Sequence, residues 1–161
     1  MVRNLMVSVF ITSPFWIHLN LLDDANLEAL SPGGPEYPDQ QITKADSANI
    51  AELYRAAMKG KWKDAKAIFR RNENAKTTKI SNLGMTALHV AASCGQSDFV
   101  VQIVKTLTKK QLEATDQVGR TALHYVALAA NAEAAEAMVK KNPDLPHLGD
   151  LQNLTPLFYA A

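Results

Sequence analysis

Four histidines and one cysteine are the side chains of this 161-residue chain that could bind a metal ion or form a nucleophile–base pair. A metal site needs several ligands that converge on one point. His89 and His124 lie 35 residues apart, and neither has a further ligand at metal-binding spacing. Cys94 follows His89 by five residues, and positions i and i+5 of a helix do not share a face. We therefore expect no metal site and no activated thiol, and we expect Cys94 to be a small, partly exposed helix residue.

Other enzyme chemistry is also missing from the sequence. The single cysteine excludes an intramolecular disulfide framework and a cysteine-rich zinc site. No nucleotide-binding glycine loop, serine nucleophile elbow or paired-carboxylate motif occurs. The sequence predicts a protein that is not an enzyme, with no catalytic, cofactor-binding or metal-binding residue and no cofactor.

The composition is that of an average globular protein, but the charge is unevenly distributed. The 17 basic and 16 acidic residues give a net charge of +1, and hydrophobic residues make up 47%. These values exclude a collagen-like, coiled-coil or wholly disordered chain. Residues 1–50 hold two basic and six acidic residues, whereas residues 51–161 hold 15 basic and 10 acidic ones. The two parts are therefore considered separately.

The first 45 residues are expected to be a poorly ordered apolar leader and linker. Residues 5–22 are mostly apolar, but Pro14, His18 and Asn20 disfavour a membrane span, and no small-x-small cleavage site follows. An unstructured leader is the favoured interpretation, and a weak membrane anchor is the alternative. Residues 31–40 contain three prolines and two glycines, which disfavour both helix and central strand and indicate a linker.

The rest of the chain repeats itself with a period of about 35 residues. The run GMTALHVAA at 84–92 recurs as GRTALHYVA at 119–127 and, 34 residues later, as NLTPLFYAA at 153–161. A degraded copy, AELYRAA, occupies 51–57. Such self-similarity indicates units that cannot bury their apolar faces alone and therefore stack into a solenoid.

Each unit reads as two short antiparallel helices followed by a polar connector. Val100, Ile103 and Val104 have the i, i+3, i+4 spacing of one helix face, and the same register is apolar one period earlier and later. A threonine precedes the first helix in the three later units, at Thr86, Thr121 and Thr155, where its hydroxyl can cap free amides. Gly60 and Gly95 are expected to supply the left-handed residue that ends the first helix, and Asn131 is expected to replace it in the next unit. Ser97 and Asp98 are expected to cap a second helix.

These features resemble the ankyrin repeat. The TALHVAA run, its trailing glycine and the later apolar pairs resemble the consensus closely in 84–107, well in 119–140 and weakly in 49–71. The wording around them is similar to plant ankyrin proteins that carry a C-terminal membrane-spanning PGG domain. The resemblance implies an all-α solenoid with repeats at about 49–80, 81–115 and 116–149 and a partial repeat at 150–161, within a domain of residues 46–161. It also implies that His89 and His124 make structural hydrogen bonds between adjacent units.

By the same resemblance, the chain is expected to bind a protein partner through its connector tips and the adjoining first helices. Mapped onto this sequence, the partner-binding positions are Asn82, Leu83, Met85, Ser93, Cys94, Gln117, Val118, Arg120, Leu128 and Ala129. Leu88→Ala is expected to cost about 2–5 kcal/mol, as for a buried leucine. Arg120→Ala is expected to weaken the partner and to change stability by no more than about 0.5 kcal/mol.

A run of basic residues marks the first unit. It comprises Arg55, Lys59, Lys61, Lys63, Lys66, Arg70, Arg71, Lys76 and Lys79. The run could be a patch for an acidic partner, a lipid headgroup or RNA, or the solvated outer face of a terminal unit. The solvated face is the favoured interpretation, and no nucleic-acid partner is expected, because the aromatic or glycine pattern of a nucleic-acid module is absent.

Two functional hypotheses follow from these observations. The first is a non-catalytic interaction module in the cytoplasm, with a protein partner of unknown identity. The second, implied by the plant family, is the cytosolic regulatory arm of a membrane-anchored protein in stress or defence signalling, at the plasma membrane. That role requires membrane spans in a missing C-terminal domain or the weak N-terminal anchor. The partial last repeat places Leu157, Phe158 and Tyr159 on a first helix without its partner helix, and this end is expected to fray and to expose apolar surface.

Overall fold

The computed structural model describes residues 44–160, which lie in the second of the two units into which the chain divides, Gln41–Ala161. The expected leader, anchor and Pro/Gly linker fall on residues 1–43 and lie outside the described residues. The proposed start of the repeat domain at residue 46 stays a prediction.

Helix pairs follow one another along the described chain, each joined to the next by a short helical turn and a connector. The pairs are α2 Lys44–Met58 with α3 Trp62–Arg71, α4 Ala87–Ser93 with α5 Ser97–Thr106, and α7 Ala122–Leu128 with α8 Ala132–Lys141, followed by α9 Pro156–Ala160. The helical turns are η2 Glu73–Lys76, α6 Lys109–Leu112 and η3 Leu145–His147. Within the part of the chain that the structure describes, the β structure consists of an isolated antiparallel bridge between Thr115 and Thr121.

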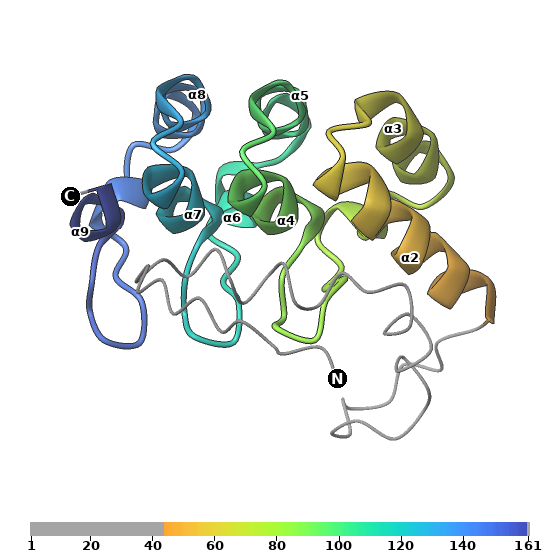
Figure 1. Cartoon of the computed structure of the whole chain (residues 1–161), viewed down its shortest axis with the longest axis horizontal. Coiled ribbons are helices and arrows are strands. Elements are labelled where there is room, and N and C mark those ends of the chain that lie inside the picture. The colour runs from red at the N-terminus through yellow and green to blue at the C-terminus, as the bar shows by residue number, and fades with distance from the viewer. Residues whose placement is uncertain (1–43, 161) are drawn as a thin grey trace, which may run out of the picture. The chain divides into compact units, whose positions relative to one another are not determined.

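The helices form two layers. The first helices of successive pairs, α2, α4, α7 and α9, pack in one layer, and the second helices, α3, α5 and α8, pack in the other (Figure 1). Each pair contacts the pairs next to it, so the core continues from repeat to repeat. The predicted all-α solenoid of stacked helix pairs is therefore confirmed.

Apolar residues at repeating positions fill the space between the layers. Leu53, Leu88 and Leu123 occupy one position of the first helices, and each is at most 4% exposed. The second helices contribute a buried stripe, which in α5 consists of Phe99, Val100, Ile103 and Val104. Buried alanines at 56–57 and 91–92 allow the helices to approach closely. The register predicted from the 35-residue period is thus the register of the core.

The first helices end as expected in two repeats and differently in the third. Gly60 and Gly95 have left-handed backbones, with φ of 66° and 68°. In the next repeat the left-handed residue is Ala130, with φ of 50°, so the prediction that Asn131 takes this conformation is wrong. Asn131 instead caps α8, because its side chain accepts a hydrogen bond from the Ala134 amide. Ala130, whose Cβ makes the left-handed backbone unfavourable, therefore occupies a strained position directly before the asparagine that caps α8.

The expected caps of the second helix are also corrected. Ser97 and Asp98 lie inside the first turn of α5, and Gln96 is the residue that precedes the helix. Gln96 donates a hydrogen bond to the Met58 carbonyl of the preceding repeat, at 2.9 Å. One repeat later, Asn131 donates to the Ser97 hydroxyl at 2.7 Å. This position therefore connects neighbouring repeats as well as starting a helix.

Candidate functional site

His89 and His124 connect adjacent repeats through both ring nitrogens. Nδ1 of His89 lies 2.8 Å from the Thr86 hydroxyl, and Nε2 lies 3.1 Å from the Arg120 carbonyl of the next repeat. His124 repeats this geometry with the Thr121 hydroxyl at 3.0 Å and the Leu154 carbonyl at 3.0 Å. Each threonine and histidine also form a capping box at the start of their helix. The structural role expected for these histidines is confirmed.

The electrostatics of His89 fit this role. Burial lowers the pKa of His89 to about 4, and this effect outweighs the hydrogen bond to the Arg120 carbonyl, which raises the pKa. The ring is therefore neutral at pH 7, with Nε2–H donating to the carbonyl and Nδ1 accepting. Within residues 46–160, no three His, Cys, Asp or Glu side chains come together in a way that could hold a metal ion.

A side-chain oxygen at one repeating position organises each connector as a hairpin. Asp116 Oδ1 accepts hydrogen bonds from the amides of Val118 and Arg120, each at 2.9 Å. Asp150 Oδ1 does the same for Gln152 and Leu154, and the Ser81 hydroxyl does so for Leu83 and Met85. The chain reverses through Gly84, Gly119 and Asn153, which all have positive φ. The hairpins therefore have the same internal bonding although their sequences differ.

Backbone hydrogen bonds join each hairpin to the next. The Gln117 amide donates to the Leu83 carbonyl at 3.0 Å, and the Leu151 amide donates to the Val118 carbonyl at 3.1 Å. The hairpins project from the same side of the helical layers (Figure 1). Their tips therefore form a continuous row whose backbone is fixed from repeat to repeat.

Large apolar side chains are exposed along this row. Leu83 is 38% exposed, Val118 41% and Leu151 70%. We call these three residues the apolar tips. Leu151 was not among the expected positions, although it follows Gln117 by one 34-residue period and could have been found from that spacing. Asn82 and Gln117 are exposed beside the apolar tips, as expected of tip residues.

Met85 is a correction to the predicted partner-binding set. Its side chain is fully buried in the core, and its carbonyl accepts a hydrogen bond from the Ile80 amide across the base of the hairpin. The backbone pairing turns this side chain inward, whereas Leu83, two residues earlier, lies at the exposed tip. Met85 therefore stabilises the fold and offers no surface to a partner.

Arg120 differs from the other predicted tip residues, because its guanidinium is engaged within the molecule. Nε lies 3.7 Å from Asp150 Oδ2, and the guanidinium carbon lies 4.8 Å from the centre of the Tyr159 ring. The Arg120 side chain is only 26% exposed and the Asp150 side chain is fully buried. Arg120 therefore connects its own hairpin to the next hairpin and to α9.

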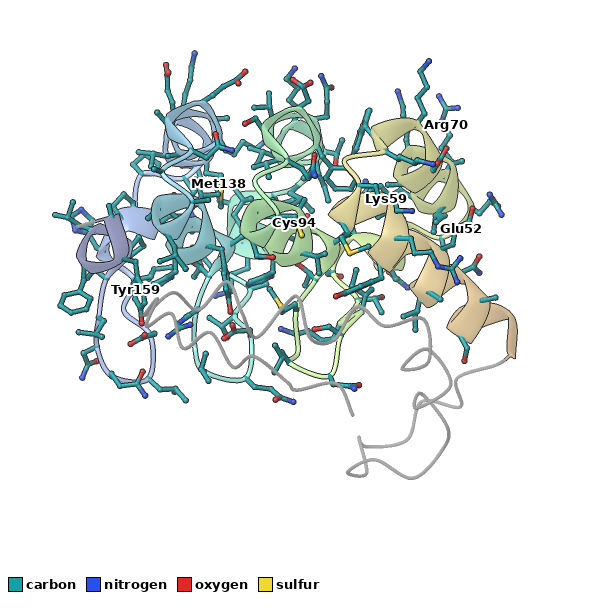
Figure 2. The ribbon with its side chains drawn as sticks, viewed as in Figure 1. Glu52, Lys59, Arg70, Cys94, Met138 and Tyr159 are labelled. Atoms are coloured by element: carbon teal, nitrogen blue, oxygen red, sulfur yellow. The ribbon has the colours of Figure 1, made fainter. Side chains whose placement is uncertain are left out.

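The sequence reasoning missed the tyrosine–aspartate pairs around Arg120. The Tyr125 hydroxyl donates to Asp116 Oδ2 at 2.5 Å, and the Tyr159 hydroxyl donates to Asp150 Oδ2 at the same distance. Tyr159 extends from α9 toward its hairpin (Figure 2). Burial, reinforced by the Asp116 carboxylate, raises the pKa of Tyr125. The identical nine-residue spacing of the two pairs is a signal that the sequence contains.

The remaining predicted positions lie at the ends of the first helices. Ser93 and Cys94 are partly buried at the end of α4, and Leu128 and Ala129 take the same places at the end of α7. Figure 2 shows Cys94 at this end of α4. Burial raises the pKa of the Cys94 thiol despite a hydrogen bond from Ser93, which lowers it. The thiol is therefore protonated and unreactive at neutral pH.

No helix within residues 44–160 is long and apolar enough to cross a membrane.

The sequence of this repeat array is similar to known proteins. A family model described as ankyrin repeats (3 copies) matches residues 53–146. Inversin of Mus musculus is 25% identical over 120 residues, and inversin of Canis lupus familiaris and of Homo sapiens are each 28% identical over the same length. The alignments cover 74% of this chain but only 11% of each of these relatives.

Proposed function

Because this chain belongs to the ankyrin repeat family, and is thus a protein–protein interaction module, we propose that it binds its partner through the hairpin row and the adjoining ends of α4 and α7. The residues assigned to this surface are Asn82, Leu83, Ser93, Cys94, Gln117, Val118, Leu128 and Ala129 from the sequence and Leu151 from the structure. Met85 and Arg120 are left out for the reasons given above. The partner is a protein of unknown identity.

The exposed apolar tips on a fixed backbone are the observation that carries this proposal. Apolar side chains at the centre of an interface contribute most when their pocket and their own backbone are already ordered. Leu83 and Val118 lie on hairpins whose backbones are bonded to each other, so little conformational entropy remains to be lost on binding. Neither side chain is part of the buried core. These two exposed side chains can therefore contact a partner without any loss of core packing.

A non-catalytic role completes the proposal. Four side chains that could take part in catalysis have structural roles instead: His89 and His124 connect repeats, and Asp116 and Asp150 order hairpins. The Cys94 thiol is held protonated by burial. We infer a binding module without an enzymatic reaction or a cofactor, located in the cytoplasm.

The test compares the proteins captured from a native extract by two variants of the full chain. Leu83→Ser/Val118→Ser changes two apolar tips, and Ala67→Ser/Val101→Ser changes two residues of the second-helix layer as a matched control. We expect at least one protein captured by the unmodified chain to be lost with the tip variant and retained with the control. Capture profiles that are identical for the two variants would refute the proposed surface.

The alternative function is the cytosolic regulatory arm of a plant membrane-anchored ankyrin protein in stress or defence signalling. The sequence of residues 52–62, 86–100 and 119–127 supports it, by resemblance to plant ankyrin proteins with a PGG domain. Sequencing of the complete transcript tests it, with about four downstream apolar segments of ~20 residues as the supporting result. A complete transcript without any such segment would exclude a C-terminal anchor.

A further inference from the structure

A basic residue recurs at one position of the second-helix layer. Arg70, Lys105 and Lys140 follow one another at intervals of 35 residues, in the last turns of α3, α5 and α8. All three side chains are exposed, and Arg70 lies on the side of α3 that faces away from α2 (Figure 2). Since α5 packs between α3 and α8, the three residues lie on neighbouring helices. We call them the basic row.

No acidic side chain among residues 46–160 forms an ion pair with the basic row. The ion pairs found there involve other residues, namely Lys76 with Glu73, Lys110 with Glu113 and Arg120 with Asp150. Lys141 adds positive charge beside the row, because its Nζ reaches the Lys105 carbonyl at 3.5 Å. This contact also places the last turn of α8 against the last turn of α5.

The opposite ends of the same helices carry no such pattern. There the equivalent position is Lys63 in α3, Asp98 in α5 and Glu133 in α8, so that one cation is followed by two anions. A cation in the last turn of a helix interacts favourably with the helix dipole, wherever in the turn it lies. The helix dipole therefore does not explain why the three cations occupy the same position in their helices. This shared position is what aligns the three side chains along the array.

The spacing of the basic row selects the conformation of an acidic ligand. Packed helices lie about 8–10 Å apart, which sets the interval between successive cations. A polyproline II segment has three residues per turn and advances about 9.3 Å per turn, so residues i, i+3 and i+6 lie on one face at nearly this interval. A β-strand presents every second residue at about 6.6 Å, and an α-helix presents neighbours at about 5–6 Å. The polyproline II segment matches with adjacent turns, whereas an α-helix comes near this interval only between residues i and i+7, at about 10.5 Å.

We propose that the basic row is a docking surface for an acidic, proline-rich segment of a protein partner, bound as a polyproline II helix with Asp or Glu at every third position. The three carboxylates pair with Arg70, Lys105 and Lys140 in order along the repeats. This surface belongs to the second-helix layer and the hairpin row projects elsewhere (Figure 1), so its occupancy is independent of the function proposed above.

The probe is the peptide acetyl-(Glu-Pro-Pro)3-amide with a fluorescent label, and binding to the full chain is measured by fluorescence polarisation. The control peptide has the same composition, with its three glutamates in one block followed by six prolines. The row variant is Arg70→Gln/Lys105→Gln/Lys140→Gln. The control variant, Lys59→Gln/Lys63→Gln/Lys66→Gln, has the same net charge and changes exposed residues outside the row. Circular dichroism checks that both variants are folded.

We expect the periodic peptide to bind about tenfold more tightly than the block peptide, as three weak ion pairs acting together allow. The row variant should lose this advantage, and the control variant should keep it. Equal binding of the two peptides, or equal loss in the two variants, would show that only net charge matters and would overturn the proposal. Row-dependent binding to vesicles with 30% phosphatidylserine, or to a 20-nucleotide RNA, that is stronger than binding to the periodic peptide would assign the row to that ligand instead.

Discussion

At the scale of single residues, His89 makes the stability of the array depend on pH. A proton on His89 would remove the acceptor used by Thr86 and place a charge in the core. The pKa of His89 is about 4 in the folded chain and 6.5 in the unfolded chain, so the unfolded chain takes up the proton first as the pH falls. The contribution of the neutral His89 to the free energy of unfolding is therefore fully present above pH 6.5 and is lost as the pH falls from 6.5 to 4.

This difference in pKa predicts a loss of about 2 kcal/mol in the free energy of unfolding between pH 7.5 and pH 5. Urea unfolding at a series of pH values measures it. His89→Gln should lower the free energy of unfolding at pH 7.5. It should also make this free energy less dependent on pH, because one proton fewer is taken up on unfolding. Asn82→Gln, a change at an exposed position that removes no titratable group, is the control. An equally steep dependence in His89→Gln would contradict the assignment.

Arg120 gives a second residue-scale prediction, which replaces the one drawn from the sequence alone. Its removal leaves the buried Asp150 carboxylate without its cation and the Tyr159 ring without its cation–π partner. Arg120→Ala should therefore cost about 1–2 kcal/mol of stability. Urea unfolding measures the cost, and Lys110→Ala is the control, because its ion pair with Glu113 is exposed and should be worth less than about 0.5 kcal/mol. A neutral Arg120→Ala would show that the contact contributes nothing.

Ala130 gives a third residue-scale prediction, because its backbone is left-handed, a conformation that glycine adopts without strain. Ala130→Gly should raise the melting temperature, corresponding to a gain of about 0.5–1 kcal/mol. Gly95→Ala is the matched reverse change at the equivalent position, and a Cβ there would meet no atom within 4 Å. It should therefore lose stability through backbone strain alone. Changes of the same sign in both variants would contradict this reasoning.

At the scale of helices and hairpins, the buried leucine of the first helix predicts the largest effect. Leu88 is 2% exposed between the two layers, and Leu88→Ala should cost about 2–5 kcal/mol in a urea unfolding measurement. Leu83→Ala, at an exposed apolar tip, removes the same atoms and should cost much less. Equal costs at the two positions would mean that the assignment of core and tip is wrong.

The helices and their stacking were predictable from the sequence because the 35-residue period places apolar residues on the same faces in every unit. Leu88 and Leu123, and the stripes of the second helices, all follow from this spacing. Pro156 is the first residue of α9, where its missing amide hydrogen costs nothing, and this too can be read from the sequence. The helices and their buried faces depend only on local chemistry and on periodicity, and both can be read from a single sequence.

The contacts between hairpins were not predictable in the same way. Arg120 meets Asp150 and Tyr159 only after two repeats have stacked, and these residues lie 30 and 39 positions away in the chain. The inward turn of Met85 depends on its backbone pairing with Ile80. Ala130 is left-handed because Asn131 is needed to cap α8 and to contact Ser97. Each of these requires the relative placement of neighbouring elements, which residue spacing does not contain.

At the scale of the whole array, the described repeats differ in how well they are covered. Leu157 and Phe158 on α9 are 77% and 62% exposed, as expected from the sequence, while the residues of α7 lie between α4 and α9. We expect amide hydrogen exchange to be faster in 156–160 than in 122–128. Exchange measured by mass spectrometry on peptides from these segments checks the order, and equal protection would contradict it.

The bonds between repeats also determine how the array would respond to a pulling force. The two later interfaces each hold one histidine-to-carbonyl bond and one hairpin-to-hairpin backbone bond, such as His89 to Arg120 and Gln117 to Leu83. Because a repeat contacts only its neighbours, tension on the two ends would break one interface at a time. A released 35-residue repeat adds about 120 Å of extended chain. The array would therefore lengthen under tension in discrete steps, one repeat at a time.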